Sequence, residues 1–239
     1  MKVVITGGTK GIGWAMIEEF AANGFDIAFC SRSKKDLDHR AAALLAVYPE
    51  IRVITKQVDM SKKSEVLAFA ASIKEYWGEV DVLINNAGVF LPGEISEEEE
   101  GRLETMIETN LYSAYHLTRA LLPIILPKKQ GHIFNICSIA SKIAYPNGGS
   151  YSISKFALLG FSKVLREELK EKGIKVTAIL PGATWSHSWK DVDLPDDRLM
   201  QAADIAKTVY CAYTLSPSAV IEDIVIRPQL GDLKDSDFS

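Results

Sequence analysis

Short hydrophobic runs alternate with longer amphipathic segments along almost the whole chain. The runs are rich in β-branched and aromatic residues, which favours strands. They cover Val3–Thr6, Ile27–Cys30, Val53–Val58, Val82–Ile84, Ile133–Ile136, Val176–Leu180 and Ile221–Ile226. Segments with helical spacing lie between them and include Ile12–Asn23, Ser61–Trp77, Ser96–Leu126 and Ser150–Lys172. Strands that alternate with helices in this way predict an α/β fold, with a parallel sheet covered by helices on both faces.

N-capping residues indicate where two of the predicted helices begin. Ser61 is expected to begin one of them, and Ser96 with Glu99 forms a capping box at the start of the longest. The acidic run Glu97–Glu100 then falls in a first helical turn, where the helix dipole and solvent explain it without a bound cation. The chain shows no repeat, linker or break in composition, so we expect residues 1–239 to form a single domain.

Composition excludes several classes of protein. With 47% hydrophobic residues, 24% charged residues and a formal net charge of -4, the chain gives no electrostatic reason to expect nucleic acid or an anionic membrane as a partner. No apolar run approaches the length of about 18 residues needed to span a bilayer, and no signal peptide is present. The three cysteines lack metal-ligand spacing. We expect a soluble cytoplasmic protein without a metal site or disulfide.

A glycine-rich turn follows the first predicted strand and opens the first predicted helix. Glycines permit the tight bend and the close approach of backbone amides, and those amides, with the helix dipole, can hold a pyrophosphate. The position after a strand and before a helix favours a dinucleotide site over an ordinary loop. The residues expected to bind the cofactor here are Gly7, Thr9, Lys10, Gly11, Ile12 and Gly13.

The end of the second predicted strand indicates which dinucleotide binds. Proteins that prefer NAD usually place Asp or Glu at this position to bind the ribose 2′-hydroxyl. Here the chain has Ser31 followed by Arg32, and no acid stands at the expected place. Arg32 can bind a 2′-phosphate through a charge-assisted pair, and Lys10 adds a second positive charge on the same side. These residues favour NADP(H) as the cofactor.

Tyr151 and Lys155 stand four residues apart at the start of a predicted helix. Residues at this spacing share one helical face, so the phenol and the ammonium can act at one site. A free tyrosine has a pKa near ~10, and a neighbouring ammonium favours its phenolate form. The pair is therefore a candidate for general acid-base chemistry.

These motifs together resemble those of the short-chain dehydrogenase/reductase family, in its compact single-domain form, and are similar to those of 3-oxoacyl-acyl-carrier-protein reductases. The resemblance extends from Val3 to about Arg227. The matching residues, in the order in which the family has them, are Thr6-Gly7-x-x-x-Gly11-x-Gly13, Asn85-Asn86-Ala87-Gly88, Asn110, Ser138, Tyr151-x-x-x-Lys155 and Pro181-Gly182.

The resemblance implies a Rossmann-type, doubly wound sheet of about seven strands in the order 3-2-1-4-5-6-7, and a role for each catalytic candidate. Tyr151 would give a proton in reduction and accept one in oxidation. Ser138 would hydrogen-bond the substrate oxygen. Lys155 would lower the tyrosine pKa and bind the nicotinamide ribose. Asn110 would hold a water that relays protons from Lys155 to solvent.

The resemblance also extends the cofactor site. Asp59 resembles the residue that meets the adenine. Thr184 and Ser186 stand where the family places a donor to the carboxamide, and Ser186 occupies the position that is often Thr. Residues 183–200 would form the substrate loop. The segment implied to line the two riboses comprises Asn86, Ala87 and Gly88.

The leading hypothesis is thus an NADP(H)-dependent carbonyl reductase or alcohol dehydrogenase acting on a small molecule. A 3-oxoacyl-thioester reductase is one subtype. A lyase or epimerase would be expected to have a longer region after Pro181, and a non-catalytic, NADP(H)-responsive binding protein would be expected to have lost the Ser, Tyr and Lys set. The family resemblance further implies a homotetramer or homodimer.

Overall fold

The structure is a computed structural model in which residues 1–185 and 194–233 are described. Seven parallel strands form a sheet in the order β3-β2-β1-β4-β5-β6-β7, as expected. The first strand is central, since Val3 pairs with both Ile27 and Val82. The strands are β1 (Lys2–Thr6), β2 (Asp26–Ser31), β3 (Val53–Gln57), β4 (Val82–Asn85), β5 (Gly131–Ile136), β6 (Ile174–Pro181) and β7 (Asp223–Ile226).

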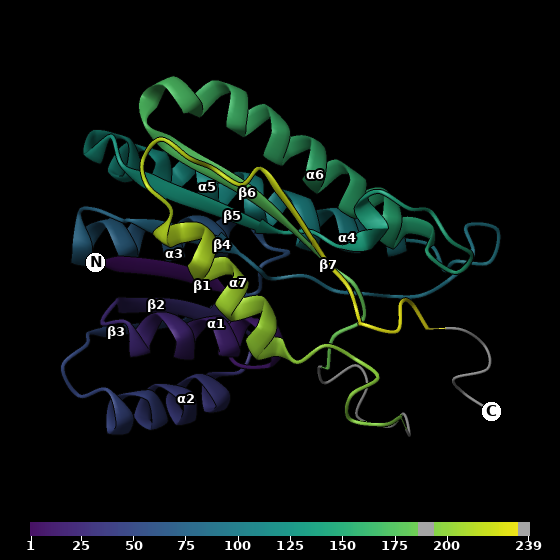
Figure 1. Cartoon of the computed structure of the whole chain (residues 1–239), viewed down its shortest axis with the longest axis horizontal. Coiled ribbons are helices and arrows are strands. Elements are labelled where there is room, and N and C mark those ends of the chain that lie inside the picture. The colour runs from purple at the N-terminus through teal and green to yellow at the C-terminus, as the bar shows by residue number, and fades with distance from the viewer. Residues whose placement is uncertain (186–193, 234–239) are drawn as a thin grey trace.

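Helices cover both faces of the sheet, which confirms the doubly wound architecture (Figure 1). The first hydrophobic cluster packs α1, α2 and α7 on one face, and the second packs α3, α5 and the end of α6 on the other. The helices are α1 (Gly11–Ala22), α2 (Lys34–Val47), α3 (Lys63–Trp77), α4 (Arg102–Ile107), α5 (Ser113–Ile125), α6 (Gly149–Leu169) and α7 (Ala202–Thr214).

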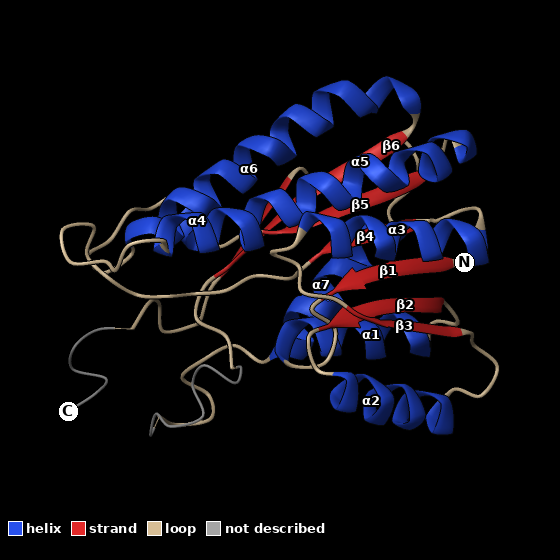
Figure 2. Ribbon diagram, turned by 180° about the vertical axis from the view of Figure 1, so that it is seen from behind, coloured by secondary structure: helices blue, strands red, loops and turns tan. Residues whose placement is uncertain are grey.

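All seven strands run in the same direction, so their carboxyl ends meet at one edge of the sheet. Figure 2 shows the arrowheads of β1 and β2 pointing away from the N-terminus toward this edge. Ligands of open α/β sheets bind outside the carboxyl ends of the strands, where the chain crosses from one face to the other. Candidate residues follow β1, β2, β3, β4, β5 and β6 at this edge, and the others lie on η1 (Glu108–Tyr112) and α6. No helix among the described residues is long and apolar enough to cross a membrane.

The long helix predicted over Ser96–Leu126 is helical only from Arg102 onward and is not a single α-helix. Residues up to Gly101 form turns, α4 begins at Arg102, and a π-helix, η1 (Glu108–Tyr112), separates α4 from α5. Gly101 has a φ of 86°, which lies in the left-handed region and cannot continue a right-handed helix. The capping box is therefore absent, and Glu99 instead pairs with Arg102 at 3.2 Å.

The start of α3 also differs from the prediction. The helix begins at Lys63. Ser61 instead donates its backbone N–H and its hydroxyl to the Asp59 carboxylate, at 3.0 and 2.8 Å. Since both bonds run back toward β3, Ser61 closes the turn after that strand and does not cap the helix.

Candidate active site

The glycine turn after β1 has the shape that the sequence predicts. Gly7 and Gly11 have φ values of 66° and 52°, a region that side chains disfavour. A Cβ on Gly13 would lie 2.3 Å from the carbonyl oxygen of Gly7, so any side chain there would push the turn and the helix apart. The glycines thus allow α1 to start directly against the end of β1.

The first turn of α1 offers unpaired backbone N–H groups to a ligand. The first N–H groups of a helix have no partner within the helix, and here no side chain caps them and no acidic residue stands in the first turn. Such a helix start attracts anions through both its N–H groups and its dipole. The cradle therefore fits a pyrophosphate.

Arg40, on α2, contacts the glycine turn and is not among the residues predicted for the site. Its Nε donates to the carbonyl oxygen of Thr9 at 3.0 Å, and its guanidinium lies 4.3 Å from the centre of the Trp14 ring. Arg40 is far along the chain from Thr9, and only the packing of α2 beside α1 brings the two together. A lone arginine in the sequence carries no signal of this role.

Thr6 and Asn86 join the glycine turn to the loop that follows β4. The Thr6 hydroxyl accepts hydrogen bonds from the backbone N–H groups of Asn86 at 3.0 Å and Ala87 at 2.9 Å. In return, the Asn86 side chain donates to the carbonyl oxygens of Thr6 at 2.9 Å and Gly7 at 3.2 Å. These bonds place Asn86 and Ala87 beside the glycine turn, and their contact with the riboses stays a prediction.

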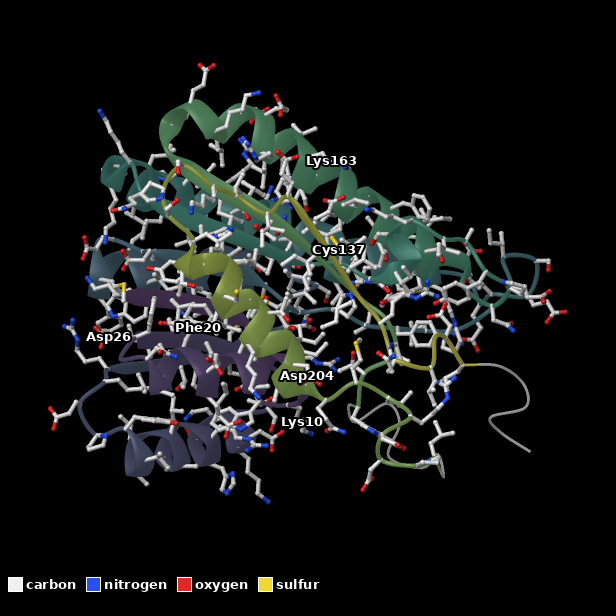
Figure 3. All side chains as sticks on the ribbon, in the orientation of Figure 1. Lys10, Phe20, Asp26, Cys137, Lys163 and Asp204 are labelled. Atoms are coloured by element: carbon white, nitrogen blue, oxygen red, sulfur yellow. The ribbon has the colours of Figure 1, made fainter. Side chains whose placement is uncertain are left out.

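The two cations proposed for the 2′-phosphate lie at the start of α1 and at the end of β2. Lys10, labelled in Figure 3, lies 3.5 Å from the Asp36 carboxylate at the protein surface. Arg32 is exposed, and its backbone carbonyl accepts a bond from Gln57 at 2.9 Å. Ser31 precedes it at the end of β2 with its hydroxyl 3.3 Å from the N–H of Ser33.

Asp59 lies at the end of β3 near Arg32. Burial raises its pKa, but hydrogen bonds from Ser61 and the charges of Lys62 and Arg32 together hold that pKa below its ordinary value. The carboxylate is therefore ionised at neutral pH and committed to the local turn.

Tyr151 and Lys155 face the same side of α6, at the carboxyl end of β5. The Lys155 Nζ lies 5.8 Å from the centre of the Tyr151 ring and donates to the carbonyl oxygen of Ile136 at 2.9 Å. Lys155 is only 5% exposed, and burial lowers the pKa of its ammonium to about 8. A buried amine of this kind is poised to titrate near physiological pH.

Ser138 completes the group. It follows β5, caps the short 3₁₀-helix η3 (Ile139–Ser141) and acts on the Tyr151 phenol through its side chain. Burial raises the pKa of Tyr151, and the influence of the Ser138 side chain opposes that rise only in part. Burial is the largest of these influences on the phenol, and the lowering of its pKa by Lys155 stays a prediction. Tyr151 is therefore a neutral phenol at pH 7.

Asn110 lies behind Lys155 in the π-helix η1. Its side chain exchanges two hydrogen bonds with the backbone of Val89, at 2.7 and 3.0 Å, and donates to the Ser154 hydroxyl at 2.9 Å. A Cβ on Gly88 would lie 3.2 Å from Asn110 Oδ1 and 3.5 Å from Lys155 Nζ, so the missing side chain lets the β4 loop close on both. Asn110 thus holds that loop, and its part in a water relay stays a prediction.

Comparison with known proteins identifies the family. The model of a family described as short chain dehydrogenase matches residues 1–196. The chain belongs to the short-chain dehydrogenase family. It is similar to sepiapterin reductase of Chlorobaculum tepidum, with 33% identity over 98% of each chain.

Solved structures of other short-chain dehydrogenases share the fold. An alcohol dehydrogenase from the archaeon Thermococcus sibiricus, complexed with 5-hydroxy-NADP, has a TM-score of 0.90 and 26% identity over 98% of each chain. L-Sorbose reductase from Gluconobacter frateurii, complexed with NADPH and L-sorbose, has a TM-score of 0.86 and 26% identity over 95% of each chain. The match to 3-oxoacyl-acyl-carrier-protein reductases in particular stays a prediction.

Aromatic side chains enclose the Tyr151 phenol of this short-chain dehydrogenase. The Phe90 ring packs edge-on against the Tyr151 ring, with centres 4.8 Å apart. Burial, followed by the proximity of Tyr151 and Asp232, raises the pKa of Tyr145 to about 12. Phe90 could not be predicted as part of the site, because a single aromatic residue in a loop carries no pattern.

The predicted substrate loop is described only at its two ends. Thr184 is buried, donates its hydroxyl to the carbonyl oxygen of Gly182 at 3.0 Å, and pairs with Met200. Ser186 lies outside the described residues. Among the described residues of this short-chain dehydrogenase, no group of His, Cys, Asp and Glu side chains is placed to hold a metal ion.

Proposed function

We propose that this short-chain dehydrogenase uses NADP(H) to interconvert a small-molecule carbonyl and its alcohol, with Tyr151 as the general acid and base. The observation that carries the proposal is the convergence of Tyr151, Ser138 and Lys155 at the carboxyl end of β5. The raised pKa of Tyr151 supports the reducing direction, since a neutral phenol has a proton to give.

The turn after β1 fits the pyrophosphate of a dinucleotide, since the uncapped start of α1 and the glycines leave room and donors for it. Lys10 and Arg32 would hold the 2′-phosphate, and Lys10 would exchange its partner Asp36 for it. When bound, NADPH supplies the hydride. The other residues that would hold the cofactor are Gly7, Thr9, Gly11, Ile12, Gly13, Ser31, Asp59, Asn86, Ala87, Gly88, Tyr151, Lys155, Thr184 and Ser186.

The chain's own residues would orient the substrate and move one proton. The Ser138 hydroxyl would donate to the carbonyl oxygen of the substrate and stabilise the charge that develops on it. Tyr151 would pass its phenolic proton to that oxygen as the carbonyl carbon becomes the alcohol carbon. The Lys155 ammonium would favour the phenolate that remains, and Asn110 would hold the water through which Tyr151 regains a proton.

We also propose that the protein forms a homodimer or homotetramer through α5 and α6. Large apolar side chains that are exposed on α5, on α6 and on the π-helix η1 before α5 support this proposal. They are Tyr112 (50% exposed), Tyr115 (38%), Ile153 (45%), Phe156 (45%) and Val164 (56%). Exposed apolar patches of this kind mark interaction surfaces. Sedimentation of the purified protein tests this point, and a monomer at micromolar concentration would refute it.

The experiment that tests the enzymatic proposal compares the natural protein with Tyr151→Phe on a panel of carbonyl compounds. The panel includes aromatic aldehydes and a 3-oxoacyl thioester, and turnover is followed through the NADPH absorbance. We expect the variant to bind NADPH normally and to lose at least about 10²-fold in kcat, the usual size of a general acid contribution. Retained turnover would refute the role of Tyr151. Equal binding of NADPH and NADH would refute the roles of Arg32 and Lys10.

A further inference from the structure

Glu98 binds the start of the helix that carries the catalytic candidates. It lies in the loop between β4 and α4, where the sequence predicted a solvated helical turn. One carboxylate oxygen, Oε1, accepts the backbone N–H of Ser150 at 2.9 Å. The other, Oε2, accepts the Ser150 hydroxyl in a short hydrogen bond. Both oxygens therefore bind the residue that immediately precedes Tyr151.

Two glycines shape the space around this carboxylate. A Cβ on Gly149 would lie 2.2 Å from Glu98 Oε1, and a Cβ on Gly93 would lie 2.9 Å from Glu98 Cγ. The N–H of Gly93 also donates to the carbonyl oxygen of Asn147 at 3.1 Å. The absence of side chains at Gly93 and Gly149 thus leaves the space that the Glu98 side chain fills, and the Gly93 bond ties the β4–α4 loop to Asn147 just before α6.

The first turn of α6 has no other charged cap. Its N-cap is Gly148, which has no side chain to offer, and no acidic residue stands in the first turn. A carboxylate at a helix start satisfies free N–H groups and interacts favourably with the dipole. The bonds from Ser150, helped by the charge of Arg102, hold the pKa of Glu98 below its ordinary value, so Glu98 is ionised at neutral pH.

Glu98 also links the two walls of the site. The loop that contains it begins at β4 and includes Phe90, whose ring packs on Tyr151. Glu98 ties the far end of that loop to Ser150, so the loop and the first turn of α6 cannot move apart without breaking the two bonds. Tyr151 is held between them, within hydrogen-bonding reach of Ser138.

We propose that Glu98 is a positioning residue for Tyr151, which fixes the first turn of α6 so that the phenol stays aligned with Ser138 and the substrate oxygen. The inference rests on the proposed function. Small displacements of a catalytic group cost large factors in rate, so the effect of losing Glu98 falls on kcat.

The test compares Glu98→Ala and Glu98→Gln with Glu97→Ala as a matched control. Glu97 is the preceding exposed acid, and no hydrogen bond or ion pair links its side chain to the described part of the chain. A glutamine in place of Glu98 can still accept the Ser150 N–H and donate to the Ser150 hydroxyl, whereas alanine loses both bonds. The readouts are kcat, KM, the Kd for NADPH, the pH profile of kcat and the melting temperature.

We expect Glu98→Ala to lower kcat by about tenfold or more, with the Kd for NADPH within about twofold of the natural value, because the phosphate cradle is elsewhere. The apparent pKa in the kcat profile should shift in Glu98→Ala and not in Glu97→Ala. Glu98→Gln should recover most of the lost kcat.

A fall in melting temperature with kcat unchanged in the folded protein would overturn the proposal, since Glu98 would then serve stability alone. If Glu98→Ala does not fold, Ser150→Ala takes its place, because it removes the hydroxyl bond and keeps the carboxylate and the backbone bond. Unchanged kcat and pH profile in that variant would likewise overturn the proposal. If Tyr151→Phe retains turnover, the proposed function fails, whereas an inactive Tyr151→Phe with a fully active Glu98→Ala refutes only the role of Glu98.

Discussion

His132 should make the folded protein sensitive to mild acid. Its Nε2 lies 2.7 Å from the Thr177 hydroxyl, which in turn donates to the carbonyl oxygen of Ile221 at 2.5 Å. Since that hydroxyl already donates its hydrogen to Ile221, Nε2 must carry a hydrogen and donate it to the Thr177 oxygen. Nδ1 is buried and finds no partner among the described residues. A second proton would therefore add an unpaired charge to the core, stacked on Phe134.

The size of this effect follows from the pKa. Burial, followed by the charge of Lys175 on β6, lowers the pKa of His132 from 6.5 to about 3. Because this pKa is lower in the folded protein, the unfolded chain binds the proton more tightly. Neutral His132 therefore costs no stability above pH 6.5, and the free energy of unfolding decreases as the pH falls from 6.5 toward 3. The loss is about 2 kcal/mol at pH 5 and reaches about 5 kcal/mol below pH 3.

The measurement is the free energy of unfolding in urea at pH 8 and pH 5, for the natural protein and for His132→Gln. The glutamine amide can donate to Thr177 as Nε2 does, but it does not titrate. The variant should therefore lose about 2 kcal/mol less stability than the natural protein between these two pH values. His39→Gln, at an exposed position on α2, is the control and should behave like the natural protein. If His132→Gln and the natural protein lose the same stability, the argument from burial is wrong.

Two further predictions concern the glycine turn and the cysteines. Gly13→Ala should abolish NADPH binding in a fluorescence titration, because its Cβ would lie 2.3 Å from the Gly7 carbonyl oxygen; binding within about tenfold of normal would show that the turn adapts. Mass spectrometry after iodoacetamide treatment at pH 8 should find a single adduct, on the exposed Cys211. Cys30 and Cys137 are buried with pKa values raised to about 12 and 11, so they should react only after unfolding, and early modification of either would contradict their burial.

The fold could be predicted because its signals are local and repeated. Each strand is a short apolar run, and α1, α3 and α6 show helical spacing, so the alternation predicted a parallel sheet without knowledge of any contact. The glycine turn could be predicted for the same reason. The positive φ of Gly7 and Gly11 and the close approach of Gly13 to the Gly7 carbonyl are all local features of the turn. The one large error, a single helix over Ser96–Leu126, arose where an acidic stretch with good helix formers satisfied the helical pattern but turned at Gly101.

The site was predicted only in part, because much of it depends on contacts between distant segments. The spacing of Tyr151 and Lys155 placed both on one face of α6, as the structure has them. The spacing could not show that Lys155 would bond the Ile136 carbonyl, or that burial would raise the pKa of Tyr151. Those are properties of the environment that β5 and the β4 loop create around the helix.

The sequence by itself determined the alternation of strands and helices along the chain, the glycine turn and the residue types available for proton transfer. Periodicity, glycine geometry and i to i+4 spacing all act over short stretches of chain. Only the tertiary structure decided which acid of the Glu97–Glu100 run caps α6. It also decided that Arg40 hydrogen-bonds the glycine turn at Thr9. Neighbouring acids in an acidic run are equivalent as sequence. They become different only when packing brings one of them against the free N–H groups of a helix far along the chain.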